Sequence, residues 1–154
     1  MESMIVYASR HHGNTEKVVR YLEERYEITV VNGEEATAID GAAYDLIGFA
    51  SGIDFGKFYP PITELAERLA PGKFVYALYT CAKDDGKYGD QIREIAERTG
   101  GRYLGKFGCR GYNTYGPWKL IGGMNKSHPD GQELEQAATF YEQMLALSSG
   151  QIDL

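Results

Sequence analysis

The chain has 154 residues, of which 43% are hydrophobic, and this is enough for one domain with a buried core. Its formal net charge of −6 argues against nucleic acid as a partner, and its two cysteines exclude a disulfide framework. No apolar run is long enough to cross a bilayer and no leader segment is recognisable. We therefore expect a single domain over residues 1–154, located in the cytoplasm, without stable membrane association, as a monomer or weak dimer.

Hydrophobic periodicity predicts strands and helices that alternate along the chain. The predicted strands cover 4–8, 27–31, 44–50, 73–79 and 102–109. The predicted helices cover 14–26, 60–69, 88–99 and 132–147, and the segment 33–43 is too weakly patterned for a long helix. This alternation indicates an α/β domain whose parallel sheet has helices on both faces.

The first predicted strand is followed at once by the polar turn SRHHGNT, residues 9–15, and then by a helix. Unpaired N–H groups and the positive end of the helix dipole favour an anion in such a turn. Ser9, Asn14 and Thr15 add side-chain donors, and Gly13 permits a close backbone approach. The turn lacks the lysine of nucleotide triphosphate loops and the spaced glycines of dinucleotide loops, which leaves a small phosphate. The alternative is an ordinary connection in which Asn14 caps the helix.

Two later loops look equally unlike plain connectors. The loop 51–59, after the third strand, has three aromatic residues and two glycines among its nine positions. Such rings could sandwich a flat aromatic ligand, or Phe55 and Tyr59 could fold back into the core. In the loop 80–88, after the fourth strand, an acidic pair before Gly86 is expected to form a turn and could also place negative charge beside a bound ring.

Together these features resemble the flavodoxin family, whose first loop reads roughly [ST]-x-[ST]-G-x-T before the first helix. Gly13, Asn14 and Thr15 match that pattern, whereas the upstream half departs from it. The resemblance extends over nearly the whole chain and implies a flavodoxin-like three-layer sandwich, with five parallel strands in the order 2-1-3-4-5 and helices on both faces. It also implies FMN, with its phosphate in the first loop, its ring between the other two loops and Tyr88 over one face of the ring. In this strand order, ligands bind outside the carboxyl ends of strands one and three.

The predicted FMN-binding residues all come from these loops and from the end of the fifth strand. They are Ser9, Arg10, His11, His12, Gly13, Asn14, Thr15, Ser51, Gly52, Ile53, Asp54, Phe55, Gly56, Phe58, Thr80, Cys81, Ala82, Lys83, Tyr88 and Arg110. No catalytic residue is assigned. No metal site is assigned either, because adjacent histidines on a turn point in different directions and we find no carboxylate or thiol cluster to complete a site with His11, His12 or His128.

A connection of about twenty residues, 110–129, follows the fifth strand and is rich in aromatic residues, which opposes disorder. It could cover the ring, form a substrate pocket, dock a partner, or pack over the edge strand as a structural flap. A similar loop occurs in the flavodoxin-like menaquinone-dependent protoporphyrinogen dehydrogenase group. That loop is more basic than this one, which weakens the case for quinone or membrane work.

Cys81 and Cys109 end two strands that are neighbours in the expected order. In a reducing cytoplasm the ordinary interpretation is two small buried hydrophobic residues. The alternative is a dithiol that relays electrons to the flavin.

Two functions follow from the resemblance. The first is an electron carrier in which FMN shuttles electrons between a reductase and an acceptor protein. The alternative is an FMN-dependent NAD(P)H:quinone or small-molecule reductase, in which the 110–129 loop covers the flavin. A carrier is expected to show negligible turnover with NAD(P)H alone, whereas a reductase should consume it, so whether the chain is an enzyme stays open.

Overall fold

The computed structural model describes residues 1–36, 38–111 and 127–153. Its elements in chain order are β1 (Ser3–Ala8), η1 (His11–Gly13), α1 (Asn14–Glu23), β2 (Thr29–Asn32), β3 (Leu46–Asp54), β4 (Lys57–Phe58), α2 (Pro60–Leu69), β5 (Phe74–Cys81), α3 (Asp90–Thr99), β6 (Arg102–Arg110) and α4 (Gly131–Ser148). The segment 33–43 forms no regular helix in its described residues, as the sequence predicts. No helix of these described ranges is both long enough and apolar enough to span a membrane.

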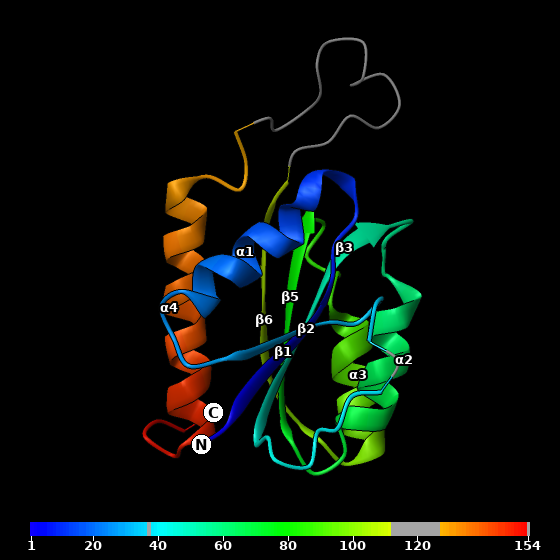
Figure 1. Cartoon of the computed structure of the whole chain (residues 1–154), viewed down its shortest axis with the longest axis vertical. Helices are drawn as coiled ribbons and strands as arrows, with labels where there is room; N and C mark the ends of the chain where they lie inside the picture. The colour runs from blue at the N-terminus through cyan, green and yellow to red at the C-terminus, as the bar shows by residue number, and fades with distance from the viewer. Residues whose placement is uncertain (37, 112–126, 154) are drawn as a thin grey trace.

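A twisted parallel sheet runs through the middle of the molecule (Figure 1). Its strand order is β2-β1-β3-β5-β6, and each neighbouring pair on this path is parallel. This confirms the predicted order 2-1-3-4-5. Because the strands are parallel, the ends of β1, β3, β5 and β6 that lead into the predicted loops meet at one edge of the sheet, the upper edge in Figure 1.

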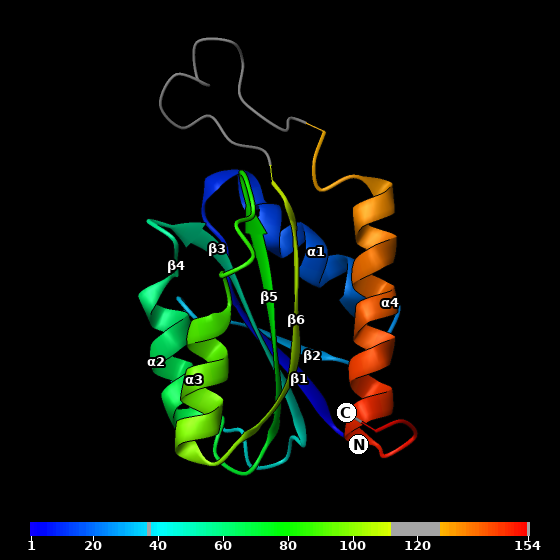
Figure 2. The ribbon, with the colours of Figure 1, turned by 180° about the vertical axis from the view of Figure 1, so that it is seen from behind.

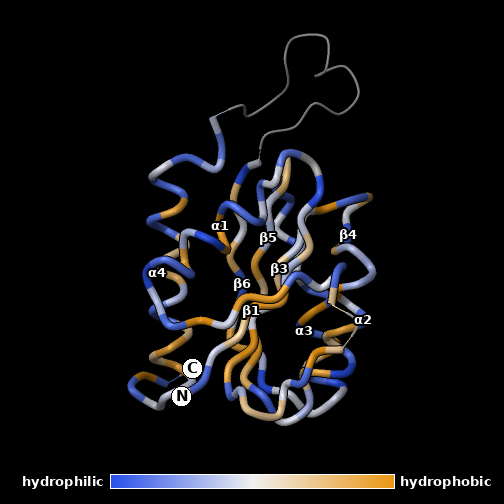
Figure 3. Tube along the Cα trace, viewed as in Figure 1, coloured by the Kyte–Doolittle hydropathy of each residue, from blue (hydrophilic) through white to orange (hydrophobic). Residues whose placement is uncertain are grey.

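Helices cover both faces of this sheet. α1 and α4 lie on one face, and α2 and α3 lie on the other (Figure 1, Figure 2). Two hydrophobic cores result, one on each side of the strands. All six residues of β1 are buried, as expected for a central strand that is covered on both faces. The hydropathy colouring of Figure 3 shows the apolar residues gathered along the strands between the helical layers.

The prediction of a loop over 51–59 is wrong in part. β3 continues to Asp54, and the chain returns as the short antiparallel strand β4, with Asp54 opposite Lys57. The turn between them is formed by Phe55 and Gly56, whose φ angles are +52° and +76°. Positive φ at both central residues is the pattern of a type I′ hairpin turn, which usually has asparagine, aspartate or glycine at the first position. Because residue 55 is a phenylalanine, the sequence pattern does not predict this hairpin.

Some element boundaries differ from the prediction by two or three residues. α3 begins at Asp90 instead of 88, because Gly89 adopts φ +87° at the N-cap position. α1 ends at Glu23 instead of 26, and β5 continues to Cys81 beyond the predicted end at 79.

Candidate functional site

The first predicted loop makes a tight left-handed turn before α1. His12 and Gly13 have φ angles of +61° and +66°, and Gly13 occupies the N-cap position of the helix. The N–H of Gly13 donates to the carbonyl of Arg10 at 2.9 Å, and the N–H of Glu16 donates to Ser9 Oγ at 3.1 Å. The Ser9 hydroxyl therefore accepts the N–H of Glu16, an amide in the first turn of the helix. The helix begins at Asn14, the residue after Gly13. A Cβ added to Gly13 would have no described atom beyond its chain neighbours within 4 Å, so this turn is open on that side.

The first turn of α1 contacts the ends of two strands. Thr15 Oγ1 and Thr80 Oγ1 are hydrogen-bonded at 2.8 Å, and both residues are buried. The Asn14 side chain lies close to Gly111: a Cβ added to that glycine would lie 2.5 Å from Asn14 Nδ2. The structure thus brings the predicted phosphate loop together with the end of β5 and with the residue that follows β6.

Arg10 connects the first loop to two other segments. Its Nε donates to Glu34 Oε1 at 2.6 Å, and its guanidinium carbon lies 4.3 Å from the centroid of the Tyr59 ring. The hydrogen bond that Arg10 donates to Glu34 raises the pKa of Arg10, and burial raises the pKa of Tyr59 to about 12. A positive guanidinium thus stacks on a neutral ring, and Glu34 offsets much of the charge that Arg10 would offer to a phosphate.

The residues from Ser51 to Tyr59 divide between core and surface. Ser51 Oγ accepts the N–H of Tyr59 at 2.9 Å, and a Cβ added to Gly52 would lie 2.3 Å from the Tyr59 hydroxyl. Tyr59 and Phe58 are buried, whereas Phe55 is 92% exposed. The interpretation that the aromatic residues fold into the core is therefore correct for Tyr59 and wrong for Phe55. Ile53 and Asp54, at the end of β3, are half-buried.

The loop after β5 is a hydrogen-bonded turn, as the acidic pair indicates. Asp84 accepts the hydroxyl of Tyr79 at 2.6 Å and the N–H of Gly86 at 2.8 Å, and Asp85 accepts the N–H of Lys87 at 2.9 Å. Burial and the hydrogen bond to Asp84 both raise the pKa of Tyr79. Ala82 is half-buried and Lys83 is exposed on the same loop.

Tyr88 lies beside the tip of the β3–β4 hairpin. Its ring meets the ring of Tyr79 edge-on, with centroids 5.8 Å apart, and its Cε1 is 3.9 Å from where a Cβ of Gly56 would stand. The N–H of Phe58 donates to Gln91 Oε1 at 3.0 Å, which fixes the hairpin to the start of α3. The second and third predicted loops thus lie side by side at the sheet edge, with Tyr88 and the exposed Phe55 as their accessible rings. Burial raises the pKa of Tyr88, so its phenol is neutral at ordinary pH.

The two cysteines are free and buried on opposite faces of the sheet. Cys81 belongs to the core under α2 and α3, whereas Cys109 belongs to the core under α1 and α4. Burial raises the pKa of each thiol to about 12. The interpretation as buried hydrophobic residues is confirmed. The alternative of a dithiol relay is wrong, because the sheet separates the two side chains.

A cluster around Glu133 joins the end of β6 to the start of α4. Glu133 Oε2 accepts the N–H of Arg110 at 2.8 Å, and Glu133 Oε1 is hydrogen-bonded to His128 Nδ1. Asp130 and Glu133 form a reciprocal capping box at the start of α4. Ligand atoms of His128, Asp130 and Glu133 lie within 4.8 Å of one another, so the expectation that no carboxylate accompanies a histidine is wrong for His128. The D-x-x-E pattern before an apolar helix, Asp130 to Glu133, is the sequence signal for this cluster.

Two predictions from the sequence concern residues that the structure does not describe. The side chain of His11 is not described, and neither are residues 112–126 of the predicted 110–129 connection. Arg110, at the start of that connection, is exposed.

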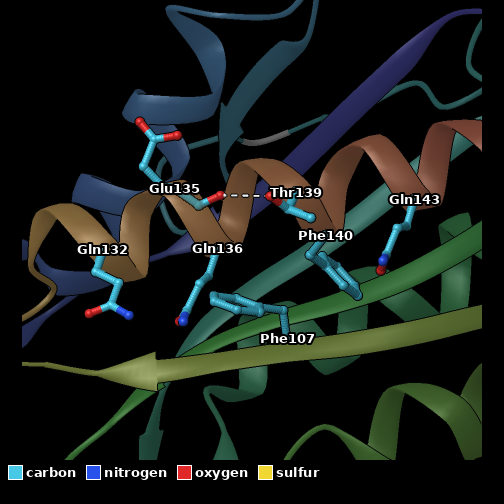
Figure 4. Close-up of a pocket in the computed structure, with 7 residues that line it drawn as sticks. All are labelled: Phe107, Gln132, Glu135, Gln136, Thr139, Phe140 and Gln143. Carbon is cyan, nitrogen blue, oxygen red and sulfur yellow. Dashed lines mark hydrogen bonds between the residues drawn. The ribbon is translucent and has the colours of Figure 1, made fainter.

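An open hollow of about 400 Å³ lies between α4 and β6 (Figure 4). The rings of Phe107 and Phe140, which help line it, have centroids 5.7 Å apart, and glutamine side chains of α4 lie beside them. The lining residues are Phe107, Gln132, Glu135, Gln136, Thr139, Phe140 and Gln143. The hollow is on the α4 side of the sheet, away from the hairpin and from α2 and α3. It contains none of the predicted FMN-binding residues.

Comparison with known proteins supports the fold. No family model matches the chain. It is similar to the uncharacterized protein MJ0298 of Methanocaldococcus jannaschii, with 32% identity over 148 residues that cover 94% of this chain and 99% of that protein. A short-chain flavodoxin associated with a non-canonical PDU bacterial microcompartment superposes with a TM-score of 0.69 at 15% identity, over 96% of this chain and 99% of the other. Oxidised flavodoxin 1 from Bacillus cereus gives 0.65 at 16% identity, over 95% and 99%. The fold is flavodoxin-like.

Proposed function

This chain belongs to one family with MJ0298, and we propose that it binds FMN and transfers electrons between protein redox partners. One observation carries the proposal. Among the described residues, His12 and Phe55 are the two non-glycine residues with positive φ. One precedes α1 and the other is at the tip of the β3–β4 hairpin, both at the edge of the sheet where folds of this strand order bind ligands. Such backbone conformations cost energy and concentrate at functional sites.

The described residues fit the two ends of FMN. The first turn of α1, beside the open Gly13, would hold the phosphate through the positive end of the helix and through the Thr15 hydroxyl, which can donate to a phosphate while it accepts from Thr80. Phe55 and Tyr88 offer aromatic faces for a flat ring. When bound, FMN would supply the redox chemistry. The chain would bind and orient it and exclude water from one side.

The net charge of the whole chain favours a basic protein partner. This charge is −6, although the hairpin and the loop next to it carry lysines as well as aspartates. Complementary charge would steer association and make its rate fall as the salt concentration rises.

The first test is a titration of the purified protein with FMN and, separately, with riboflavin, followed by visible absorption. We expect the flavin bands to shift with FMN, and riboflavin to bind more weakly because it lacks the phosphate. Anaerobic NADPH should then leave the bound flavin oxidised, as in a carrier without its reductase. Rapid bleaching by NADPH would favour the reductase function instead. Failure to bind FMN would refute the proposal.

A matched pair of variants assigns the ring site. Phe55→Ser removes an exposed aromatic residue from the hairpin tip, and Ile152→Ser removes an exposed apolar residue near the C-terminus, where 49% of Ile152 is accessible. Both variants should keep the stability of the wild type within about 0.5 kcal/mol, because surface substitutions seldom cost more. Only Phe55→Ser should weaken FMN binding. Equal FMN affinity in the two variants would remove Phe55 from the site.

A further inference from the structure

The ammonium group of Lys106 is bound to the loop that carries Tyr88. Its Nζ donates to the carbonyl of Gly86 at 2.7 Å and to the carbonyl of Tyr88 at 2.8 Å, and it lies 3.2 Å from Asp90 Oδ1. These three acceptors use all three donors of a lysine. They belong to the last turn of the loop after β5 and to the first residue of α3, so one side chain of β6 contacts the second half of this connection.

A bulge in β6 directs Lys106 toward this loop. In the pairing of β5 with β6, Val75 is opposite Tyr103 while the next residue, Tyr76, is opposite Gly105, so Leu104 is inserted without a partner. Leu104 packs in the core under α1 and α4, and a Cβ added to Gly105 would face Met144 and Phe140 of α4. Two consecutive positions thus face the same side of the sheet.

The consequence for Lys106 follows from strand alternation. Without the inserted residue, position 106 would face α4, since successive side chains point to opposite faces and a shift of one residue exchanges them. With it, the Lys106 side chain lies on the α3 side, where its Cδ is 3.3 Å from where a Cβ of Gly89 would stand. Bulges commonly re-aim a side chain beside a functional site.

The held loop presents the Tyr88 ring to the hairpin. Tyr88 precedes Gly89, whose φ of +87° begins α3, and its ring contacts Tyr79 on one side and approaches Gly56 on the other. The backbone carbonyl of Tyr88 is itself one of the three acceptors of Lys106. Loss of the ammonium would leave that carbonyl and the carbonyl of Gly86 without this donor, and the ring would lose its fixed position relative to the hairpin.

We propose that Lys106 is a positioning residue for the flavin: it fixes Tyr88 through its contacts with the backbone of the 86–90 loop, and thereby sets the affinity for FMN. This inference rests on the proposed function, but its first readout does not require the cofactor. In the cofactor-free protein, Lys106→Met should raise the amide exchange rate of residues 84–90 about tenfold, because charge-assisted hydrogen bonds of the loop are lost. Lys106→Arg should restore most of the protection.

The matched control is Lys73→Met. Lys73 also donates to a backbone carbonyl, that of Ala42 at 3.4 Å, but it stands just before β5, at the opposite end of that strand from the loop. It should change neither the exchange of residues 84–90 nor the FMN affinity. Equal effects of the two methionine variants would show a general loss of stability and overturn the proposal.

A double-mutant cycle tests whether Lys106 acts through Tyr88. Lys106→Met should weaken FMN binding about tenfold in the wild-type background and less than about twofold in the Tyr88→Ala background. An equal loss in both backgrounds would overturn positioning through Tyr88, as would unchanged FMN affinity together with unchanged loop exchange in Lys106→Met. If the wild type binds no FMN, the proposed function fails instead, and increased exchange in Lys106→Met would show that the loop contact itself is real.

Discussion

Valine substitutions at Thr15 and Thr80 test how the first loop is joined to the sheet. The two hydroxyls lie 2.8 Å apart, and 2% of Thr15 and 6% of Thr80 are exposed. Valine keeps the shape of threonine and removes the hydroxyl. Each single variant therefore leaves one buried hydroxyl facing a methyl group, whereas the double variant removes both members of the pair.

The expected free energies follow from this burial. A buried polar group that loses its partner costs about 1–3 kcal/mol, while replacement of both partners by apolar groups of the same shape is close to neutral. Each single valine should thus lower the free energy of unfolding by about 1–3 kcal/mol. The double variant should lose no more than either single variant, which corresponds to a coupling energy of at least about 1 kcal/mol.

Urea denaturation of the wild type and the three variants without cofactor measures this coupling. If the losses of the single variants simply add in the double variant, the two hydroxyls are not paired and the described link between α1 and β5 is wrong. The same proteins separate structural from ligand roles. Thr15→Val should weaken FMN binding more than riboflavin binding, because its hydroxyl belongs to the proposed phosphate loop, whereas Thr80→Val should affect both ligands alike.

Two further predictions concern the stability of the core. Gly48→Ala places a Cβ 2.3 Å from Cζ of the fully buried Tyr76, and the overpacking should lower the free energy of unfolding by about 1–3 kcal/mol. Gly131→Ala is the control: it has open space around the new methyl group and should leave the free energy of unfolding unchanged or raise it by about 0.5 kcal/mol. Urea denaturation of both variants checks this, and equal effects would contradict it. The pKa values of Cys81 and Cys109 are raised from 9.0 to about 12, so between pH 9 and 12 the native state keeps thiol protons that the unfolded state releases. The free energy of unfolding should therefore fall as pH rises through this range, by about 1.4 kcal/mol per pH unit for each thiol. Replacing both cysteines by alanine should flatten this slope in denaturation series between pH 8 and 11, and an unchanged slope would show that the thiols do not cause it.

The sheet could be predicted because its signals are local. Continuous apolar runs such as Ile5 to Ala8 identify strands that are buried on both faces, and the intervening helical periods fix the parallel topology. The loops after β1, β3 and β5 were identified for the same reason, since they follow directly from the strands.

The features that were missed depend on backbone torsion or on residues far apart in sequence. The bond between Ser9 and Glu16 spans seven positions, and the stack of Arg10 on Tyr59 with its ion pair to Glu34 joins three separate segments. No periodicity records such pairings. The hairpin at Phe55 was not predicted, because its turn contains a residue type that rarely adopts left-handed torsion angles.

The carboxylate of Glu133 has a consequence for how much this protein can vary in length. Arg110 and His128 are eighteen positions apart in the sequence, yet both bond to this single side chain. The scaffold is therefore closed by its own contacts at this point, whatever chain connects the two residues. Each doubling of a closed loop costs only about 0.6 kcal/mol in entropy. This position should accept shorter connections, longer ones or grafted sequences at little thermodynamic cost while the sheet stays the same.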